Sequence, residues 1–310
     1  MRSSDSILFR ALALAAVADW LIGRTLTRGA VFMPKSPTMV TVFQLLGLVG
    51  QFAFTLTGLL AIIAMGWLTW HMRRERRGAL SLILTTLLAF SILSIFVPSG
   101  DWSNVAYHVL VLVAIALLGA TARDSRVWIF PGIALGLAQL YQTSAALSSA
   151  FHLSEPLPLT LLWFALGELF VVASGFALWW ISARGRSRGW MWLIATLAAI
   201  AFAGIYLVNP SITAMLAIWS IGLTLYLPMP LYAFSLLLTV LTMIVWLREN
   251  AGAGWAIPLL AASGYAPQIS TEVFLSIVAV WLLARVPVSQ VETTPASQSP
   301  LRNLAHNPSG

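Results

Sequence analysis

The stretch H-M-R-R-E-R-R, residues 71–77, lies between two long apolar runs and carries four arginines. Short loops rich in Lys and Arg stay on the cytoplasmic side of a membrane, because moving their charges across a bilayer is costly. We therefore take this turn as the cytoplasmic reference from which the orientation of every other apolar run is counted. The sequence constrains topology in this way, but it names no activity.

The composition excludes a water-soluble fold. The chain has 310 residues, 59% hydrophobic and 9% charged, whereas soluble domains carry roughly 25% charged residues. The net charge of +7 comes from arginines clustered between apolar runs, so we expect a lipid bilayer and no nucleic acid as partner. Without cysteine there are no disulfides, thiolate metal sites or cysteine nucleophiles. The only lysine, Lys35, lies in a proline-flanked loop, which argues against a Schiff-base pigment.

Apolar runs long enough to cross a hydrocarbon core of ~30 Å recur along the chain. The predicted spans are residues 7–26, 39–70, 78–97, 105–122, 127–151, 159–183 and 190–208, two short spans within 212–247, and a last run, 255–284. Pro228 and Pro230 divide 212–247, for which one span and a re-entrant piece is the alternative. The last run is broken or kinked at residues 264–267. The overlong second span should tilt or project into the cytoplasm.

These runs predict an all-α, polytopic integral membrane helix bundle of about ten transmembrane helices, or nine if one weak segment fails. Both termini are expected in the cytoplasm, and the protein in the cell membrane as a multi-pass protein. The bundle covers residues 1–285. Residues 286–310 are rich in Pro, Ser and Thr and lack an apolar period, so we expect a disordered cytoplasmic tail.

Charged turns and tryptophans support this orientation, since arginines favour the inner side and tryptophans the headgroup level. The inner turns carry Arg123 and Arg126, then Arg184, Arg186 and Arg188. The tryptophans expected at inner ends are Trp67, Trp70, Trp179, Trp180, Trp190, Trp192 and Trp281, and those expected near outer ends are Trp102, Trp163, Trp246 and Trp255.

The first segment, residues 7–26, has three open interpretations, because Arg10, Asp19 and Arg24 interrupt it. As a span it leaves Arg24 outside, against the positive-inside bias. The alternatives are an interfacial helix and a cleaved signal that ends near the A-x-A-like residues 16–18.

Two predicted spans carry small and polar residues at helical spacing, so that each set shares one face. One face of the second span holds Gln44, Gly47, Gln51, Thr55 and Gly58, and one face of the fifth holds Gly132, Gly136, Gln139 and Thr143. Such stripes are typical of close helix packing with interhelical hydrogen bonds, because lipid cannot satisfy an amide. The alternative is a solute pathway lined by these glutamines.

Three acids, Asp19, Glu168 and Glu272, fall within predicted spans. A charge near mid-membrane costs from about 3 to more than 10 kcal/mol, so each should face the bundle, pair, or take up a proton. Glu272 follows the break, where the dipole of a second half-helix favours a carboxylate. Neutral or Arg-paired structural acids are the alternative. The candidates for a pathway or for proton coupling are Gln51, Gln139, Glu168 and Glu272.

Four further polar residues, Asp101, His108, His152 and Glu155, map to the predicted outer side. Such side chains suit a divalent metal or acid–base catalysis. The H-x-x-E spacing of the last two is too short a match to define a site, so ordinary solvated loop residues are the simpler interpretation, and we expect no bound metal or cofactor.

Three functions are compatible with these patterns. The leading hypothesis is a transporter-like or permease-like bundle for a small solute. The second is an accessory or structural subunit of a larger complex, whose polar stripes contact other membrane subunits. The third is a membrane-embedded enzyme that acts on a lipid-linked substrate through the outer polar residues. The spans carry no P-loop, G-x-S-x-G or H-E-x-x-H motif that would indicate an enzyme. Enzyme activity stays open, because the absence of these motifs does not exclude it.

Overall fold

The computed structural model describes most of the chain as helices. Within the described residues no strand occurs, so the all-α prediction is confirmed. The described residues are 3–19, 22, 37–94, 96–97, 100–123, 125–153, 158–183, 189–208, 229–248, 252–263 and 270–286. The predicted tail beyond residue 286 and the break at residues 264–267 lie outside them.

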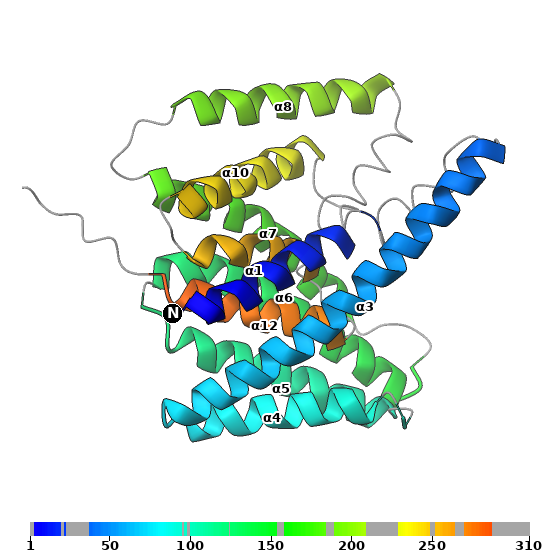
Figure 1. The fold of residues 1–310 in the computed structure, drawn as a ribbon, viewed down its shortest axis with the longest axis vertical. Coiled ribbons are helices and arrows are strands. Elements are labelled where there is room, and N and C mark those ends of the chain that lie inside the picture. Colours follow the sequence, from blue (N-terminus) through cyan, green and yellow to red (C-terminus); the bar gives the residue numbers. More distant parts are fainter. Residues whose placement is uncertain are drawn as a thin grey trace, which may run out of the picture.

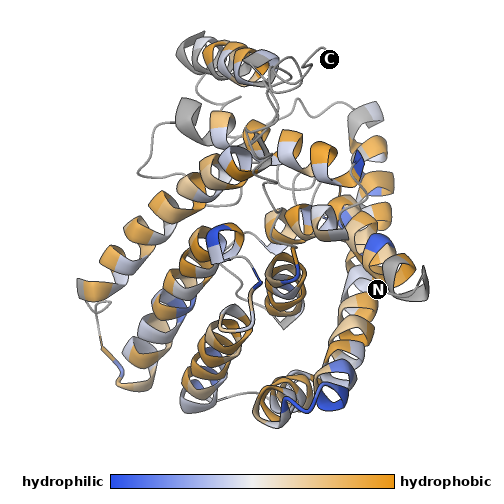
Figure 2. Cartoon of the chain, turned by 90° about the vertical axis from the view of Figure 1, so that its left-hand side faces the viewer, coloured by the Kyte–Doolittle hydropathy of each residue, from blue (hydrophilic) through white to orange (hydrophobic). Residues whose placement is uncertain are grey.

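Three described helices are long and apolar enough to span a membrane: Val40–Arg74, Asp101–Gly119 and Leu159–Ile181. The other apolar helices found there are shorter. The structure therefore supports a membrane protein by the length and composition of its helices, but it does not confirm a bundle of ten spans. Hydrophobic residues predominate along the helices, as Figure 2 shows from the end at which α3 finishes, and many large apolar side chains are exposed.

The helices follow the predicted runs in order. They are α1 (Ser3–Ala18), α3 (Pro37–Arg74), α4 (Gly78–Leu93), α5 (Asp101–Gly119), α6 (Ser125–Ala150), α7 (Pro158–Ala183), α8 (Gly189–Val208), α10 (Met229–Arg248), the 3-10 helix η3 (Gly252–Trp255), α11 (Ala256–Ser263) and α12 (Ser270–Ala284). Neighbours in sequence pack together from α3 to α7, as short connections dictate.

The reference turn closes α3 with a Schellman motif. Arg76 N–H donates to the Arg73 carbonyl at 3.1 Å, and Arg77 N–H donates to the Met72 carbonyl at 3.0 Å. Arg76 adopts a φ of 59°, the left-handed region that glycine usually occupies at this position. The chain reverses here and begins α4 at Gly78.

The helix α12 lies at the centre of the molecule (Figure 1), in contact with α3, α5, α6 and α11. Every residue from Val273 to Ala284 is buried. A helix that is apolar on all sides requires neighbours on all sides, since water cannot cover any of its faces. The last apolar run is therefore the core of the bundle.

The helices α11 and α12 pack directly against each other. The last run therefore forms two helices side by side instead of one helix that continues past a kink. The preceding η3 packs on the last turn of α10, where Gly254 lies against Leu247. The helices α11 and α12 are almost wholly buried.

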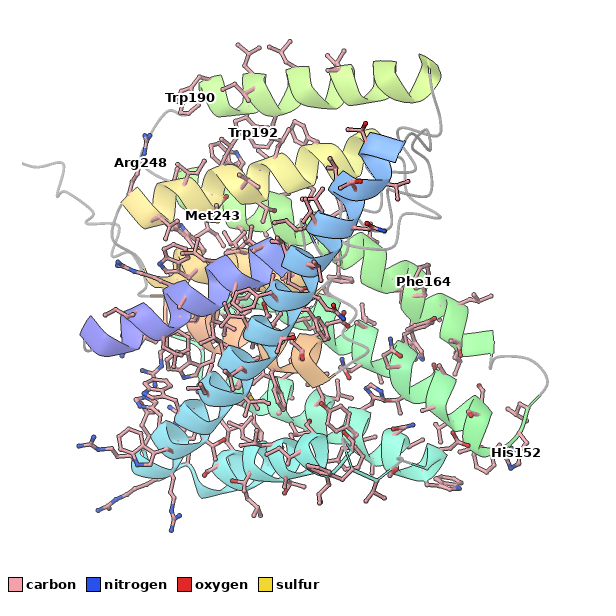
Figure 3. All side chains as sticks on the ribbon, turned by 45° about the vertical axis from the view of Figure 1, so that its right-hand side comes forward. His152, Phe164, Trp190, Trp192, Met243 and Arg248 are labelled. Carbon is pink, nitrogen blue, oxygen red and sulfur yellow. The ribbon has the colours of Figure 1, made fainter. Side chains whose placement is uncertain are left out.

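One end of the bundle gathers arginines, and we call it the arginine end. It contains the reference turn, the end of α12 at Arg285, which contacts Glu75, and the end of α10. Figure 3 shows Arg248 at the same end of the bundle as Trp190, opposite His152.

The direction of α10 corrects a prediction. We expected Trp246 and Trp255 near outer ends, but α10 finishes at the arginine end and η3 packs on its last turn. The prediction assumed that 212–247 crosses twice, and the first of these short spans lies outside the described residues. The observed direction brings Arg248 to the end where the other arginines gather.

The long helix α3 crosses the other helices obliquely (Figure 1). Its 38 residues span about 57 Å at ~1.5 Å per residue. The C-terminal half packs on α1, α4 and α12, whereas the N-terminal half is mostly exposed. The exposed, excess length of α3 extends away from the arginine end.

We predict that Arg76→Gly stabilises the protein by up to about 1 kcal/mol. A non-glycine residue in the left-handed region costs about 1–2 kcal/mol, and glycine's extra unfolded entropy offsets part of that gain. Thermal unfolding in detergent measures the change. The control Arg76→Ala removes the same charge but keeps the strained backbone, so it should give no gain; equal stabilisation by both variants would contradict the motif.

Candidate functional site

A histidine and a glutamine form a hydrogen bond between α5 and α6 in the interior of the bundle. His108 Nδ1 lies 3.0 Å from Gln139 Oε1. His108 is 8% exposed and Gln139 is fully buried. An amide oxygen only accepts, so His108 donates from Nδ1, and Nε2 is then the basic nitrogen of the neutral ring. We call these two residues the buried pair.

Two amide groups, that of Gln139 in the buried pair and that of Gln142 on the same helix, have unmatched donors. The Nε2 atoms of Gln139 and Gln142 are buried and have no hydrogen-bond partner in the part of the chain that the structure describes. A buried donor that lacks an acceptor costs about 1–3 kcal/mol. Groups of this kind favour any small polar molecule that offers acceptor atoms.

Two further polar contacts involve α5. The Tyr107 ring meets the His108 ring edge-on, with centroids 5.5 Å apart, and its hydroxyl lies 3.3 Å from Ser91 Oγ on α4. At the end opposite the arginines, Ser149 Oγ donates to Asp101 Oδ1 at 3.0 Å. Along α5, Asp101 and His108 are two turns or about 10 Å apart. Polar contacts are thus found both at that end of α5 and near its middle.

The structure brings some of the predicted site residues together and separates others. Gln139 and His108, which we assigned to different groups, are hydrogen-bonded. Gln51 is exposed on α3, and Glu272 lies half-buried in the first turn of α12. Glu168 belongs to α7, but its side chain is outside the described part.

The three described members of the outer polar group, Asp101, His108 and His152, lie in different surroundings. His108 is buried, Asp101 bonds Ser149, and His152 is exposed at the end of α6. Glu155 lies outside the described residues. Among those described, no three His, Asp or Glu side chains lie close enough to hold a metal ion.

The small residues of the fifth span serve packing. The Trp128 ring lies between Gly132 of its own helix and Gly119 of α5, and a Cβ at either glycine would overlap the ring. On α7, Gly175 likewise allows close approach of α10, whose Ser235 Oγ donates to the Val172 carbonyl at 2.9 Å. These contacts hold α6 on α5 and α10 on α7.

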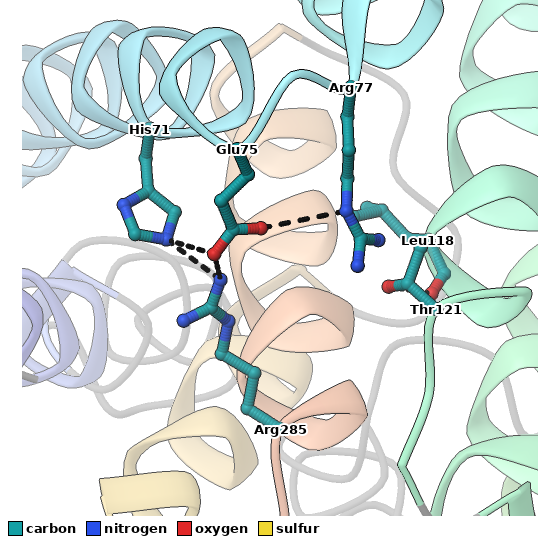
Figure 4. Close-up of polar contacts among 6 residues, drawn as sticks. All are labelled: His71, Glu75, Arg77, Leu118, Thr121 and Arg285. Atoms are coloured by element: carbon teal, nitrogen blue, oxygen red, sulfur yellow. Dashed lines mark hydrogen bonds and ion pairs between the residues drawn. The ribbon is translucent and has the colours of Figure 1, made fainter.

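A second polar site, the inner ion cluster, consists of His71, Glu75, Arg77 and Arg285 at the arginine end (Figure 4). Arg285 Nη2 donates to Glu75 Oε1 at 2.6 Å and lies 2.7 Å from His71 Nε2. His71 Nε2 is also 2.9 Å from Glu75 Oε1, and Arg77 Nε is 3.5 Å from Glu75 Oε2. The cluster fastens the end of α12 to the end of α3.

Aromatic rings support the inner ion cluster. His71 stacks on Trp67 with centroids 4.8 Å apart, and the Arg285 guanidinium lies 4.4 Å from the Trp281 ring centroid. Sequence analysis missed this site, because Arg285 is separated from Glu75 by 210 residues. The available signal was a single acid, Glu75, among four arginines.

Electrostatics at Glu75 favour its charged form. Burial raises the pKa of Glu75, but the hydrogen bond from Arg285 and the charges of Arg285, His71 and Arg77 outweigh it, so the pKa lies below its ordinary value. His71 Nε2 cannot serve both neighbours at once: without a proton it accepts from Arg285, and with a proton it donates to Glu75.

No family model, curated protein or solved structure matches this chain. Its function is therefore inferred from the arrangement of its own side chains.

We predict that Glu75→Gln destabilises the protein by about 0.5–1 kcal/mol near neutral pH, the range of partly exposed ion pairs. A depressed folded-state pKa stabilises the fold above the unfolded-state pKa, and this contribution is lost as pH falls through the folded-state value. The difference between the variant and the wild type should therefore disappear in acid. Chemical unfolding across the pH range measures it. The control Arg76→Gln alters an arginine outside the cluster, and an equal pH-dependent loss there would contradict the assignment.

Proposed function

We propose that the chain is a multi-pass protein of the cell membrane that carries a small polar solute, with the arginine end in the cytoplasm. The candidate spans and the largely apolar helix surfaces support membrane insertion. The gathering of Arg248 and Arg285 at the end of the reference turn supports the orientation, because positive residues favour the cytoplasmic side.

The buried pair is the observation that carries the transport proposal. Ionisable and amide side chains inside a bilayer are costly, and they mark solute pathways or proton relays. Here the amide donors of Gln139 and Gln142 are unmatched, and such donors suit a solute with carbonyl or carboxylate oxygens. The basic Nε2 of His108 is a suitable proton acceptor.

The packing of α12 supports movement around this site. α12 contacts both α5 and α6, which carry the buried pair, and it ends in the inner ion cluster. Transporters often use discontinuous helices near the bilayer midplane as binding or gating elements. We propose that η3, α11 and α12 play that part here.

A second function, that of a subunit in a larger membrane complex, is favoured by the exposed half of α3. Gln44 and Gln51 are exposed there among large apolar side chains such as Leu48 and Phe52. Lipid cannot satisfy an exposed amide, so a helix of another chain would complete this face.

Single cysteines test the proposed pathway and orientation together, since the native chain has no cysteine. We predict that a membrane-impermeant thiol reagent added to intact cells labels Gln142→Cys, three residues beyond Gln139 on α6, and Leu153→Cys beyond the end of α6. Leu135→Cys, buried on the same helix, should stay unlabelled. Arg76→Cys should react only after the cells are permeabilised. An unreactive Gln142→Cys would refute the pathway, and external labelling of Arg76→Cys would invert the orientation.

The subunit proposal predicts that Gln51→Cys forms a crosslinked product with a second copy or another membrane protein when a bifunctional thiol reagent is added to membranes. The matched control is Leu82→Cys, which is 68% exposed on α4 and carries no polar stripe. If both variants run only as monomers on denaturing gels, the exposed half of α3 contacts lipid alone and the subunit proposal fails.

A further inference from the structure

A groove lies on the bundle between α6, α7 and α8. Its volume is about 730 Å³, within the range of about 300–1,000 Å³ that is usual for ligand sites. Its walls are apolar and include Val172, Ala173, Phe176 and Trp180 of α7. Ser125 and Arg126, at the start of α6, supply the polar side chains at one end. None of these residues belongs to the buried pair or to the inner ion cluster.

The length and position of the groove match one leaflet of a bilayer. Its lining on α7 runs from Leu169 to Ile181, about 18 Å at ~1.5 Å per residue, close to half of a ~30 Å hydrocarbon core. Trp180 and Trp192 line it near the arginine ends of α7 and α8, and tryptophan favours the headgroup level. The groove therefore begins at the headgroups and leads inward.

The charge at the headgroup end of the groove selects one class of occupant. Arg126 is exposed, and a guanidinium binds phosphate oxygens with two parallel hydrogen bonds. Basic residues at the cytoplasmic surface attract anionic lipids. We infer that the groove binds an anionic phospholipid, with one acyl chain along α7 and the phosphate against Arg126. A neutral lipid would fill the walls equally well but would gain no net attraction from this charge.

This inference rests on the proposed membrane insertion, and lipid retention tests it. The full-length protein is reconstituted in vesicles of equal parts phosphatidylglycerol and phosphatidylcholine, extracted in mild detergent, and analysed by native mass spectrometry. We expect about fivefold enrichment of retained phosphatidylglycerol, the effect of one arginine at a membrane surface. Arg126→Gln should bring the ratio near one. The control Arg123→Gln removes an exposed arginine that does not line the groove and should keep the enrichment.

A second variant tests the groove without changing its charge. Ala177→Leu adds bulk to the groove wall, so it should lower retention of both lipids several-fold. The matched control Ala165→Leu makes the same change at an exposed position of α7 outside the groove. Unchanged enrichment in Arg126→Gln, or unchanged retention in Ala177→Leu, would overturn the inference. Failure of the wild type to enter vesicles would refute membrane insertion as well, whereas insertion without enrichment refutes the lipid site alone.

Discussion

The complete burial of α12 is the constraint on which the rest of the structure depends. A helix that is apolar on every side has to be enclosed, and α3, α5, α6 and α11 enclose it. Its last residue is followed directly by Arg285, a charge that cannot enter this apolar core unpaired. Glu75, at the end of α3, meets that charge at 2.6 Å. The apolar core thus determines where the ends of α3 and α12 meet, and the inner ion cluster is the consequence.

The same enclosure explains where polar chemistry is possible. The helices α5 and α6 cover α12 and also contact each other, so their shared interface is shielded. His108 and Gln139 face each other there and form a buried hydrogen bond. On α3, by contrast, Gln51 lies on the half of the helix that no neighbour covers. Enclosure, more than residue type, separates a buried polar site from an exposed polar stripe.

Run length and charge predicted the helices, because a membrane requires long apolar segments and opposes the transfer of arginines. The boundaries of α4 to α8 follow from these rules alone. The direction of α10 did not follow from them, because it depended on how many times residues 212–247 cross the membrane. The buried pair was also missed: His108 and Gln139 were assigned to different groups, because their contact depends on how α5 packs on α6. Periodicity shows which residues share a face, whereas the partner of that face depends on packing between helices.

Stability alone does not account for the polar groups around His108. An interhelical hydrogen bond in a membrane protein averages about 0.6 kcal/mol, whereas each unmatched buried donor costs about 1–3 kcal/mol. Two such donors, on Gln139 and Gln142, outweigh the gain from the bond between Gln139 and His108. A polar solute that supplies the missing acceptors reverses this balance, and for this reason we favour a binding role over a purely structural one.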